Sequence, residues 1–306
     1  MAIRKAAIIG KGAVGLLYGT LIAQNIGPDA VEFVMDDERF ARHAGEMVTV
    51  NGEPCGIAAI PASEASPVDL VILTVKATGL AGAIDSMERL VGPETRIASL
   101  LNGITSEERV AARYGWERTV LSVAQGMDAV FIGGALTFTH TGEIRFGAAE
   151  GTAPGVVDDI ANFYARAGIA HTVEADIRHR MWTKLMLNVG INQTCMAYGG
   201  THGSASEEGS EQNRCFIAAM REALAVAQAE GVDVTEADLA QMAALIASLD
   251  PAGMPSMAQD RINGKLTEVD EFAGAVIARA EKHGILVPQN RWLYERIREI
   301  EAGYAR

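Results

Sequence analysis

The sequence predicts two successive folds: an N-terminal α/β domain built on a doubly wound parallel sheet, and an all-α domain after it. Short apolar runs alternate with helical stretches through the first half of the chain. The first of these runs ends in a glycine-rich turn, Gly10-Lys-Gly-Ala-Val-Gly15, and a helical pattern follows. After about Ile177 the strand patterns stop and only long helical patterns remain. These three observations predict the order of the two domains.

The alternation of apolar runs and helical stretches predicts the strands and helices of the first half of the chain. Strands are expected at Lys5–Ile9, Val31–Met35, Asp69–Val75 and Arg96–Leu101, with helices around Val14–Gln24 and Gly79–Leu90. From about Val120 the pattern becomes β-rich, and Thr137–His140 is expected to pair with Glu143–Phe146 across the turn signal Thr141-Gly142. A helix is expected at Gly155–Ala167.

The later half predicts helices only. They are expected at Ile177–Tyr198, Glu207–Gly231, Thr235–Ser248, Ser256–Lys282 and Arg291–Glu301. Thr235 with Asp238 resembles a helix-start box. We place the boundary near residues 172–178, and expect a dinucleotide-binding Rossmann-like domain over 1–174 and a helical substrate and dimerisation domain over 175–306. The functional cleft is expected between the two domains.

Composition limits the classes of partner. The 306 residues include 39 acidic and 26 basic side chains, a formal charge of −13, which argues against nucleic acid and anionic membranes as main partners. No leader pattern and no apolar run of about 18 residues is evident, so a cytoplasmic protein is expected. The three cysteines are widely spaced, which predicts free thiols and no metal site.

The glycine turn predicts a dinucleotide site. Gly10 permits the tight turn, Gly12 lets the backbone approach a pyrophosphate, and Gly15 lets the helix pack closely on the strand. Lys11, Ala13 and Val14 complete the expected binding segment. The side chain of Lys11 is expected to point to solvent, and the alternative is that it adds attraction for the pyrophosphate. A glycine-rich turn without a ligand is the alternative.

Asp36 bears on the choice of cofactor. It ends the second expected strand, 21 residues after Gly15, where a carboxylate binds a free ribose 2′-hydroxyl and repels a 2′-phosphate. This favours NADH. The alternative is that Asp36 only ends the strand or caps a helix while Arg39 reaches the phosphate of NADPH.

A polar stripe marks the helix expected at Ile177–Tyr198. Lys184, Asn188 and Asn192 are spaced i, i+4 and i+8, so they lie within about an 80° arc of a mostly apolar helix. Buried polar groups need partners, so the stripe either lines a ligand pocket or bonds to its own protein. In the expected Ser256–Lys282 helix, Asp260, Glu268 and Asp270 taken alone are typical of solvated or ion-paired surface residues.

Several motifs together resemble the ketopantoate reductase (2-dehydropantoate 2-reductase) family through nearly the whole chain. They are the Gly10–Gly15 turn, Thr74-Val-Lys76-Ala, Leu101-Asn102-Gly103, the Lys184/Asn188/Asn192 stripe, Ser256-Met-x-Gln-Asp260, Thr267-Glu268-Val-Asp270 and His283-Gly-Ile-x-Val-Pro288-Gln-Asn290. The resemblance implies a 6-phosphogluconate-dehydrogenase-like architecture. It also implies NAD(P)H-dependent reduction of 2-dehydropantoate to (R)-pantoate, a step of pantothenate biosynthesis, by a possible homodimer.

The resemblance also implies roles for single residues. Lys184 matches a general acid at the substrate ketone, and Glu268 matches a carboxylate that works beside it. Asn188, Asn192 and Ser256 match positions that bind the substrate hydroxyl and carboxylate, while Lys76 and Asn102 match cofactor contacts near the reacting centre.

Two positions depart from the family. Asp36 stands where many members have an arginine, and His202 stands where an asparagine tends to touch substrate, although a loop histidine is more often structural. The change at His202 leaves open the reduction of another branched 2-keto acid. Two further alternatives are a dinucleotide-binding regulatory protein without catalysis and an amine or imine dehydrogenase. The Lys184 stripe makes the last alternative weaker.

Overall fold

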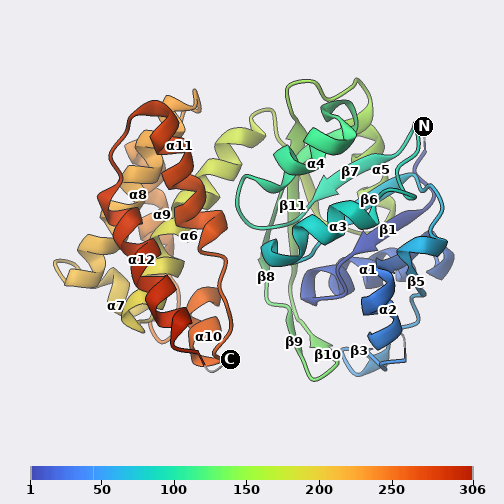
Figure 1. Cartoon of the computed structure of the whole chain (residues 1–306), viewed down its shortest axis with the longest axis horizontal. Coiled ribbons are helices and arrows are strands. Elements are labelled where there is room, and N and C mark those ends of the chain that lie inside the picture. The colour runs from blue at the N-terminus through green and yellow to red at the C-terminus, as the bar shows by residue number, and fades with distance from the viewer. Residues whose placement is uncertain (1, 44, 305–306) are drawn as a thin grey trace. The chain divides into compact units, whose positions relative to one another are not determined.

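The protein folds as two compact units. A computed structural model describes residues 2–43 and 45–304. The first unit contains Met1–Asn102 and Ser106–Ile177, and the second contains Gly103–Thr105 and Arg178–Arg306. The strands belong to the first unit, and α-helices make up most of the second (Figure 1).

An eight-stranded sheet forms the centre of the first unit, in the order β12-β11-β8-β7-β6-β1-β2-β5. Its strands are β1 (Ala6–Ile9), β2 (Val31–Met35), β5 (Ala59–Pro61), β6 (Leu70–Leu73), β7 (Arg96–Ser99), β8 (Thr119–Met127), β11 (Thr141–Ala148) and β12 (His171–Val173). Only β8 and β11 pair antiparallel within it. The chain winds from β1 to β2 on one side and returns to β6 on the other. Sheets of this type bind ligands at the carboxyl ends of the strands beside such a reversal.

Helices cover both faces of this sheet because successive strand residues point to opposite faces. Ala6 and Ile8 of β1 belong to one apolar core, and Ala7 and Ile9 belong to another. Helices α1 (Ala13–Asn25) and α5 (Val156–Arg166) contribute to the first core, and α3 (Leu80–Ser86) and α4 (Ser106–Tyr114) to the second. The doubly wound fold class predicted from the apolar runs is confirmed.

A small second sheet corrects one predicted pairing. Its order is β4-β3-β10-β9, with β3 at Thr49–Val50, β4 at Glu53–Pro54, β9 at Val130–Ile132 and β10 at Ala135–Thr137. The expected pairing of Thr137–His140 with Glu143–Phe146 is wrong, because β10 pairs with β9 and β3 while β11 pairs with β8. Asp128 accepts the backbone N–H groups of Thr139 and His140, which keeps these two residues out of a strand.

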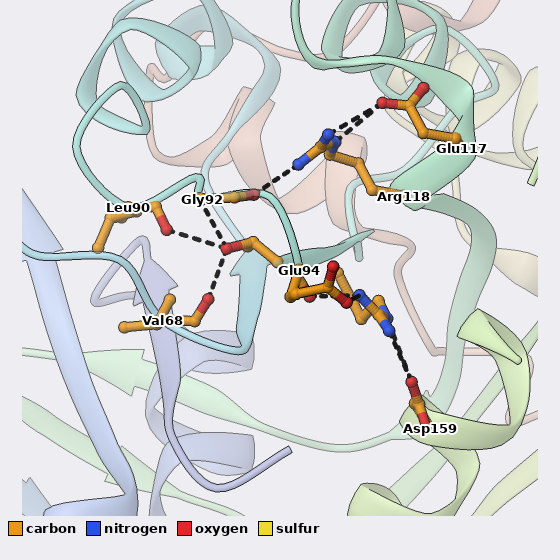
Figure 2. A network of polar contacts seen from close by, with 9 residues as sticks. Val68, Leu90, Gly92, Glu94, Glu117, Arg118 and Asp159 are labelled. Atoms are coloured by element: carbon orange, nitrogen blue, oxygen red, sulfur yellow. Dashed lines mark hydrogen bonds and ion pairs between the residues drawn. The ribbon is translucent and has the colours of Figure 1, made fainter. Parts of the chain in front are cut away.

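Polar contacts fix the loops that lead into β7 and β8, as Figure 2 shows. The Thr95 hydroxyl donates to the Val68 carbonyl at 2.6 Å and accepts the Gly92 N–H at 2.9 Å. Arg118 donates to the Gly92 carbonyl at 2.6 Å, and Arg96 pairs with Asp159 at 2.8 Å. Apart from Asp159 of α5, these residues lie at or before the amino ends of the strands, so this network braces the edge opposite the carboxyl ends of the parallel strands.

The second unit contains the helices α6 (Ile177–Tyr198), α7 (His202–Ser206), α8 (Glu211–Ala229), α9 (Glu236–Ser248), α10 (Ser256–Ile262), α11 (Ala275–His283) and α12 (Pro288–Ala302). The first unit also has α2 (Asp37–His43) and short 3-10 turns at Pro28–Ala30, Ala62–Glu64, Ala77–Gly79 and Trp116–Arg118. Helix α6 has the predicted bounds. The helix-start box is also confirmed, because Thr235 N–H donates to the Asp238 carboxylate and Asp238 N–H donates to the Thr235 hydroxyl.

The single helix expected over Ser256–Lys282 is wrong. The observed helix, α10, ends at Ile262, and the chain then passes Gly264, which has φ +60°. A π-helical turn, η5 (Asp270–Gly274), leads into α11. A positive φ favours glycine and cannot continue an α-helix. The expected Glu207–Gly231 helix likewise begins later, at Glu211, because the Ser210 hydroxyl accepts the Asn213 N–H and caps α8.

One buried carboxyl group makes stability depend on pH. Glu107 of α4 is 1% exposed, and burial raises its pKa to about 7, although hydrogen bonds from Ser106 and the Ser122 N–H oppose that rise. Between pH about 4.5 and about 7 the unfolded chain ionises this group before the folded protein does. The free energy of unfolding should therefore fall across that window.

We predict that Glu107→Gln, which cannot ionise, removes this part of the pH dependence. The stability of the variant relative to the parent should rise by about 3 kcal/mol between pH 4 and pH 8. Urea unfolding of both proteins at several pH values measures this difference, because the other titrating groups are common to both. A constant difference across the window would contradict the prediction.

Candidate functional site

Four neighbouring parallel strands place polar groups at one edge of the first sheet. Gly10 follows β1 directly and Asp36 follows β2 directly, while Lys76 and Asn102 lie three residues beyond the ends of β6 and β7. The strands are adjacent in the order β7-β6-β1-β2. Their carboxyl ends therefore share an edge, and the structure gathers at it the residues expected to bind a cofactor.

The glycine turn has room for a ligand at one position only. A Cβ on Gly15 would lie 1.9 Å from the Gly10 carbonyl oxygen, so this residue must be glycine. Gly10 has φ +119°, and the Thr74 hydroxyl donates to its carbonyl at 2.8 Å, which closes the turn against the end of β6. A Cβ on Gly12 would meet nothing within 4 Å. The space in front of Gly12 is open.

The start of α1 fits a phosphate group. Gly12 is its N-cap, and the helix has neither a side-chain cap nor an acidic residue in its first turn. The first N–H groups of a helix lack intrahelical partners and carry a partial positive charge, so they bind anions. An uncapped helix start beside open space at Gly12 is the arrangement that a dinucleotide pyrophosphate requires.

Asp36 both caps a helix and faces solvent. Its Oδ1 accepts the Arg39 N–H at 2.8 Å at the start of α2, so the capping alternative raised by the sequence is present. A carboxylate has two oxygens, and a cap at one leaves acceptor capacity for a ribose hydroxyl.

The Nζ of Lys11, the residue inside the turn, lies 6.0 Å from the centre of the Phe33 ring on β2.

A cavity of about 410 Å³ lies beside Asp36. The residues that line it carry four carboxylates and one guanidinium: Asp36, Asp37, Asp85, Glu88 and Arg89. An excess of negative charge disfavours a phosphate group there.

In the second unit, Asn188 and Asn192 of the predicted polar stripe of α6 form a connected cluster with Ser256 of α10. Asn192 donates from Nδ2 to Oδ1 of Asn188 at 3.2 Å, and its own Oδ1 accepts the Ser256 hydroxyl at 3.0 Å. Asn192 is buried, Asn188 is half-buried and Ser256 is exposed. The stripe thus does bond to its own protein, as one alternative held, and it also runs from the interior to the surface at Ser256.

Lys184 and Glu268 interact through their charges. Burial lowers the pKa of Lys184 to about 8, and the Glu268 carboxylate opposes that fall. The two residues come from α6 and from the segment before η5, 84 positions apart in the sequence. An ammonium group with a pKa near 8 is still mostly protonated at neutral pH and gives up its proton more readily than an ordinary lysine.

Models of one protein family match both the N-terminal and the C-terminal parts of the chain. The family model described as "Ketopantoate reductase PanE/ApbA" matches residues 6–151, and its C-terminal counterpart matches residues 176–301. The chain belongs to the ketopantoate reductase family.

Named relatives of this ketopantoate reductase family member span almost all of it. The 2-dehydropantoate 2-reductase of Caulobacter vibrioides is 29% identical and covers 93% of this chain and 94% of its own. That of Streptococcus pyogenes serotype M6 is 28% identical, covering 96% and 97%. The solved PanE/ApbA family ketopantoate reductase of Ralstonia eutropha superposes with a TM-score of 0.83 at 26% identity, covering 97% and 98%. A D-mandelate dehydrogenase complex with NADH shares the fold, with a TM-score of 0.86 at 23% identity, covering 98% and 100%.

One family motif and one position that departs from the family have structural contacts here. In the motif around Pro288, Glu222 of α8 accepts the N–H groups of Gln289 and Asn290, which caps the start of α12. His202 donates its backbone N–H to the Gly253 carbonyl, and a Cβ on Gly253 would lie 2.8 Å from the His202 ring nitrogen Nδ1. The histidine therefore packs against the loop that precedes Ser256.

The sequence analysis gave no role to two residues that position parts of the candidate site. Thr74, which closes the glycine turn, is one. Gln193 is another: it is fully buried, and its Oε1 accepts the Ala273 N–H of η5 at 2.9 Å. A polar residue directly after Asn192 in an apolar helix was the available signal. Among the described residues, no cluster of metal-binding side chains and no helix suited to cross a membrane is found.

The glycine turn gives a prediction that separates folding from binding. Gly12→Ala should leave the melting temperature nearly unchanged, because the new Cβ meets no protein atom. It should weaken NAD(P)H binding at least about tenfold, because the new methyl group occupies the approach to the helix N-terminus. Gly15→Ala should instead lower thermal stability sharply. Thermal melts and fluorescence titration with NADH measure the two effects. Unchanged NADH binding by a folded Gly12→Ala variant would exclude this turn as the pyrophosphate site.

Proposed function

We propose that this protein reduces 2-dehydropantoate to (R)-pantoate with a reduced nicotinamide cofactor. Family membership makes it an NAD(P)-dependent oxidoreductase. The observation that carries the proposal is the interacting pair Lys184 and Glu268, in the same unit as the Asn188–Asn192–Ser256 cluster. The names of the full-length curated relatives support this substrate.

The proposed mechanism assigns proton transfer to Lys184. The cofactor, when bound, supplies a hydride to the ketone carbon of the substrate. Negative charge then develops on the ketone oxygen, and the Lys184 ammonium stabilises it and donates the proton that completes the alcohol. Glu268 keeps Lys184 charged, because its carboxylate raises the lysine pKa against the effect of burial.

The amide cluster suits a substrate with both a hydroxyl and a carboxylate. Asparagine side chains donate through nitrogen and accept through oxygen, so Asn188 and Asn192 serve a hydroxyl group, and the exposed Ser256 serves the carboxylate. We assign residues 1–174 to dinucleotide binding and 175–306 to substrate binding, with Gly10, Lys11, Gly12, Ala13, Val14, Gly15, Asp36, Lys76 and Asn102 at the cofactor. The homodimer stays a prediction, which light scattering tests.

A substrate panel tests the proposal. Purified protein is given 2-dehydropantoate, the same branched 2-keto acid without its hydroxyl, and an aromatic 2-keto acid, each with NADH and with NADPH. Oxidation of the cofactor is followed by absorbance. We expect 2-dehydropantoate to be preferred over its analogue without the hydroxyl by at least about tenfold in kcat/KM. Turnover of a different 2-keto acid would keep the reaction class and replace the substrate, and no turnover at all would overturn the proposal.

Lys184 gives a pH prediction. The protonated form is the active acid, so kcat/KM for reduction should be level below pH about 8 and fall about tenfold per pH unit above it. Lys184→Ala should lower kcat by about 10²-fold or more, abolish this alkaline limb and leave cofactor binding nearly intact. Lys282→Ala, at an exposed lysine of α11, is the matched control. A Lys184→Ala variant with parental turnover would exclude Lys184 as the acid.

Asp36 and the acidic cavity beside it favour NADH over NADPH. We predict that Asp36→Arg shifts the ratio of kcat/KM values towards NADPH by roughly 10- to 100-fold, the value of one charge-assisted contact. Asp36→Asn, which removes the charge and keeps an oxygen to cap α2, should give a smaller shift. Glu38→Arg makes the same charge change two residues away and serves as control. A parent enzyme already selective for NADPH would contradict the assignment.

A further inference from the structure

One face of α12 contacts the segment that carries Glu268. Tyr294, Arg298 and Glu301 are spaced i, i+4 and i+7 on this helix, so they share a face. The Glu301 side chain is 3% exposed, and its Oε1 accepts both the N–H of Thr267 at 2.7 Å and the hydroxyl of Thr267 at 2.6 Å. The residue directly before Glu268 is therefore held by two hydrogen bonds to one buried oxygen.

The same face also holds the chain two residues after Glu268. Arg298 pairs with Asp270 at 2.5 Å and donates to the other Glu301 oxygen at 3.1 Å. The Tyr294 hydroxyl donates to Asp270 at 2.9 Å. Glu268 thus lies between two residues whose positions are set by α12, and the first of them, Thr267, directly follows the exposed stretch 262–266.

Helix α6 supplies a third anchor. The N–H of Gly274 bonds to the Val269 carbonyl, five residues back, which makes the turn π-helical and frees the Ala273 N–H from that carbonyl. The buried Gln193 accepts this N–H, and Gln193 lies on the helix that carries Lys184. Hydrogen bonds therefore tie the Glu268 segment to both helices.

We propose that Glu301 is a positioning residue, which holds Thr267 so that the Glu268 carboxylate stays directed at Lys184. A buried carboxylate is costly unless its oxygens are bonded, and here both oxygens are used, one of them entirely on Thr267. The proposal deepens the proposed function and rests on it for the role of the pair. Glu301 acts through Glu268 and is not assigned contact with substrate.

The pKa of Lys184 reports directly on this arrangement. Glu268 raises that pKa against burial, so a displaced carboxylate should let it fall below about 8. The chain has six lysines, so the protein labelled with ¹³C-lysine gives few Cε signals, and Lys184→Arg identifies the one to follow with pH. We expect Glu301→Ala to lower the Lys184 pKa by at least about half a unit. Glu301→Gln, which keeps an acceptor oxygen for Thr267, should lower the Lys184 pKa less than Glu301→Ala does.

Two comparisons exclude a merely structural effect. Glu299→Ala removes an exposed carboxylate of the same helix, paired with Arg296 at 3.1 Å, and should leave the Lys184 pKa unchanged. In a Glu268→Ala background, Glu301→Ala should cause no further fall, because its effect passes through Glu268. A direct effect of the Glu301 charge or a general loosening of the unit would persist in that background and would overturn the proposal. Should Glu301→Ala fail to fold, Thr267→Val, which removes only the hydroxyl, and Glu301→Gln are compared in its place.

Activity gives the matching readout. Glu301→Ala should shift the alkaline limb of kcat/KM to lower pH and reduce kcat about tenfold or more, while NADH affinity stays near the parental value. The NMR titration needs no turnover, so the two proposals can fail separately. A protein inactive on every keto acid that still shows the pKa dependence would refute the proposed function and keep this inference. An active protein in which Glu301→Ala leaves the Lys184 pKa unchanged would keep the proposed function and refute this inference.

Discussion

The second unit depends on how the polar groups of α6 are satisfied. This helix of 22 residues is largely buried, and a buried amide or ammonium is tolerated only with partners. Asn192 bonds to Asn188 and Ser256, Gln193 bonds to η5, and Lys184 interacts with Glu268. On another side of the helix, a Cβ on Gly190 would lie 2.6 Å from Met220 of α8, so the two helices pack closely there. The contacts that stabilise α6 are therefore also the contacts that orient its candidate catalytic residues.

The first unit differs, because the start of α1 at its candidate binding edge has no side-chain cap. Thr95, Arg96 and Arg118 use their hydrogen bonds to fix the loops at the amino ends of the strands. At the carboxyl ends, α1 begins without a side-chain cap, and Thr74 bonds to the carbonyl of Gly10 and leaves the first amides of the helix uncapped. Helix amides without a side-chain cap are suited to bind an anionic group.

The sequence predicted those features that depend on local pattern. The apolar runs and the Gly10–Gly15 turn predicted β1, α1 and the doubly wound sheet, because strand burial and glycine geometry are local constraints. The pairing of β10 was missed, since Asp128 acts on Thr139 and His140 from eleven and twelve residues away. The break after α10 was missed because helical spacing continues across Gly264, and the π-turn depends on Gln193, 80 residues earlier. For the site, the stripe on α6 was visible as helical spacing. Glu268 alone resembled a surface residue, and its charge interaction with Lys184 becomes visible only in the folded structure.

The pKa of Lys184 near 8 reflects two opposed effects, and the proposed mechanism depends on both. Burial alone would push the lysine towards the neutral amine, which cannot act as an acid at physiological pH. A close carboxylate without burial would keep the pKa near or above its ordinary value of 10.5, and the ammonium group would then be a weaker acid towards the developing alkoxide. The balance is sensitive to the position of Glu268, since charge interactions weaken with distance and with access of water. The position of the Glu268 carboxylate depends on the backbone around it. The side chains of Glu301, Gln193 and Arg298 bond to residues between 267 and 273 and fix that backbone next to an exposed loop.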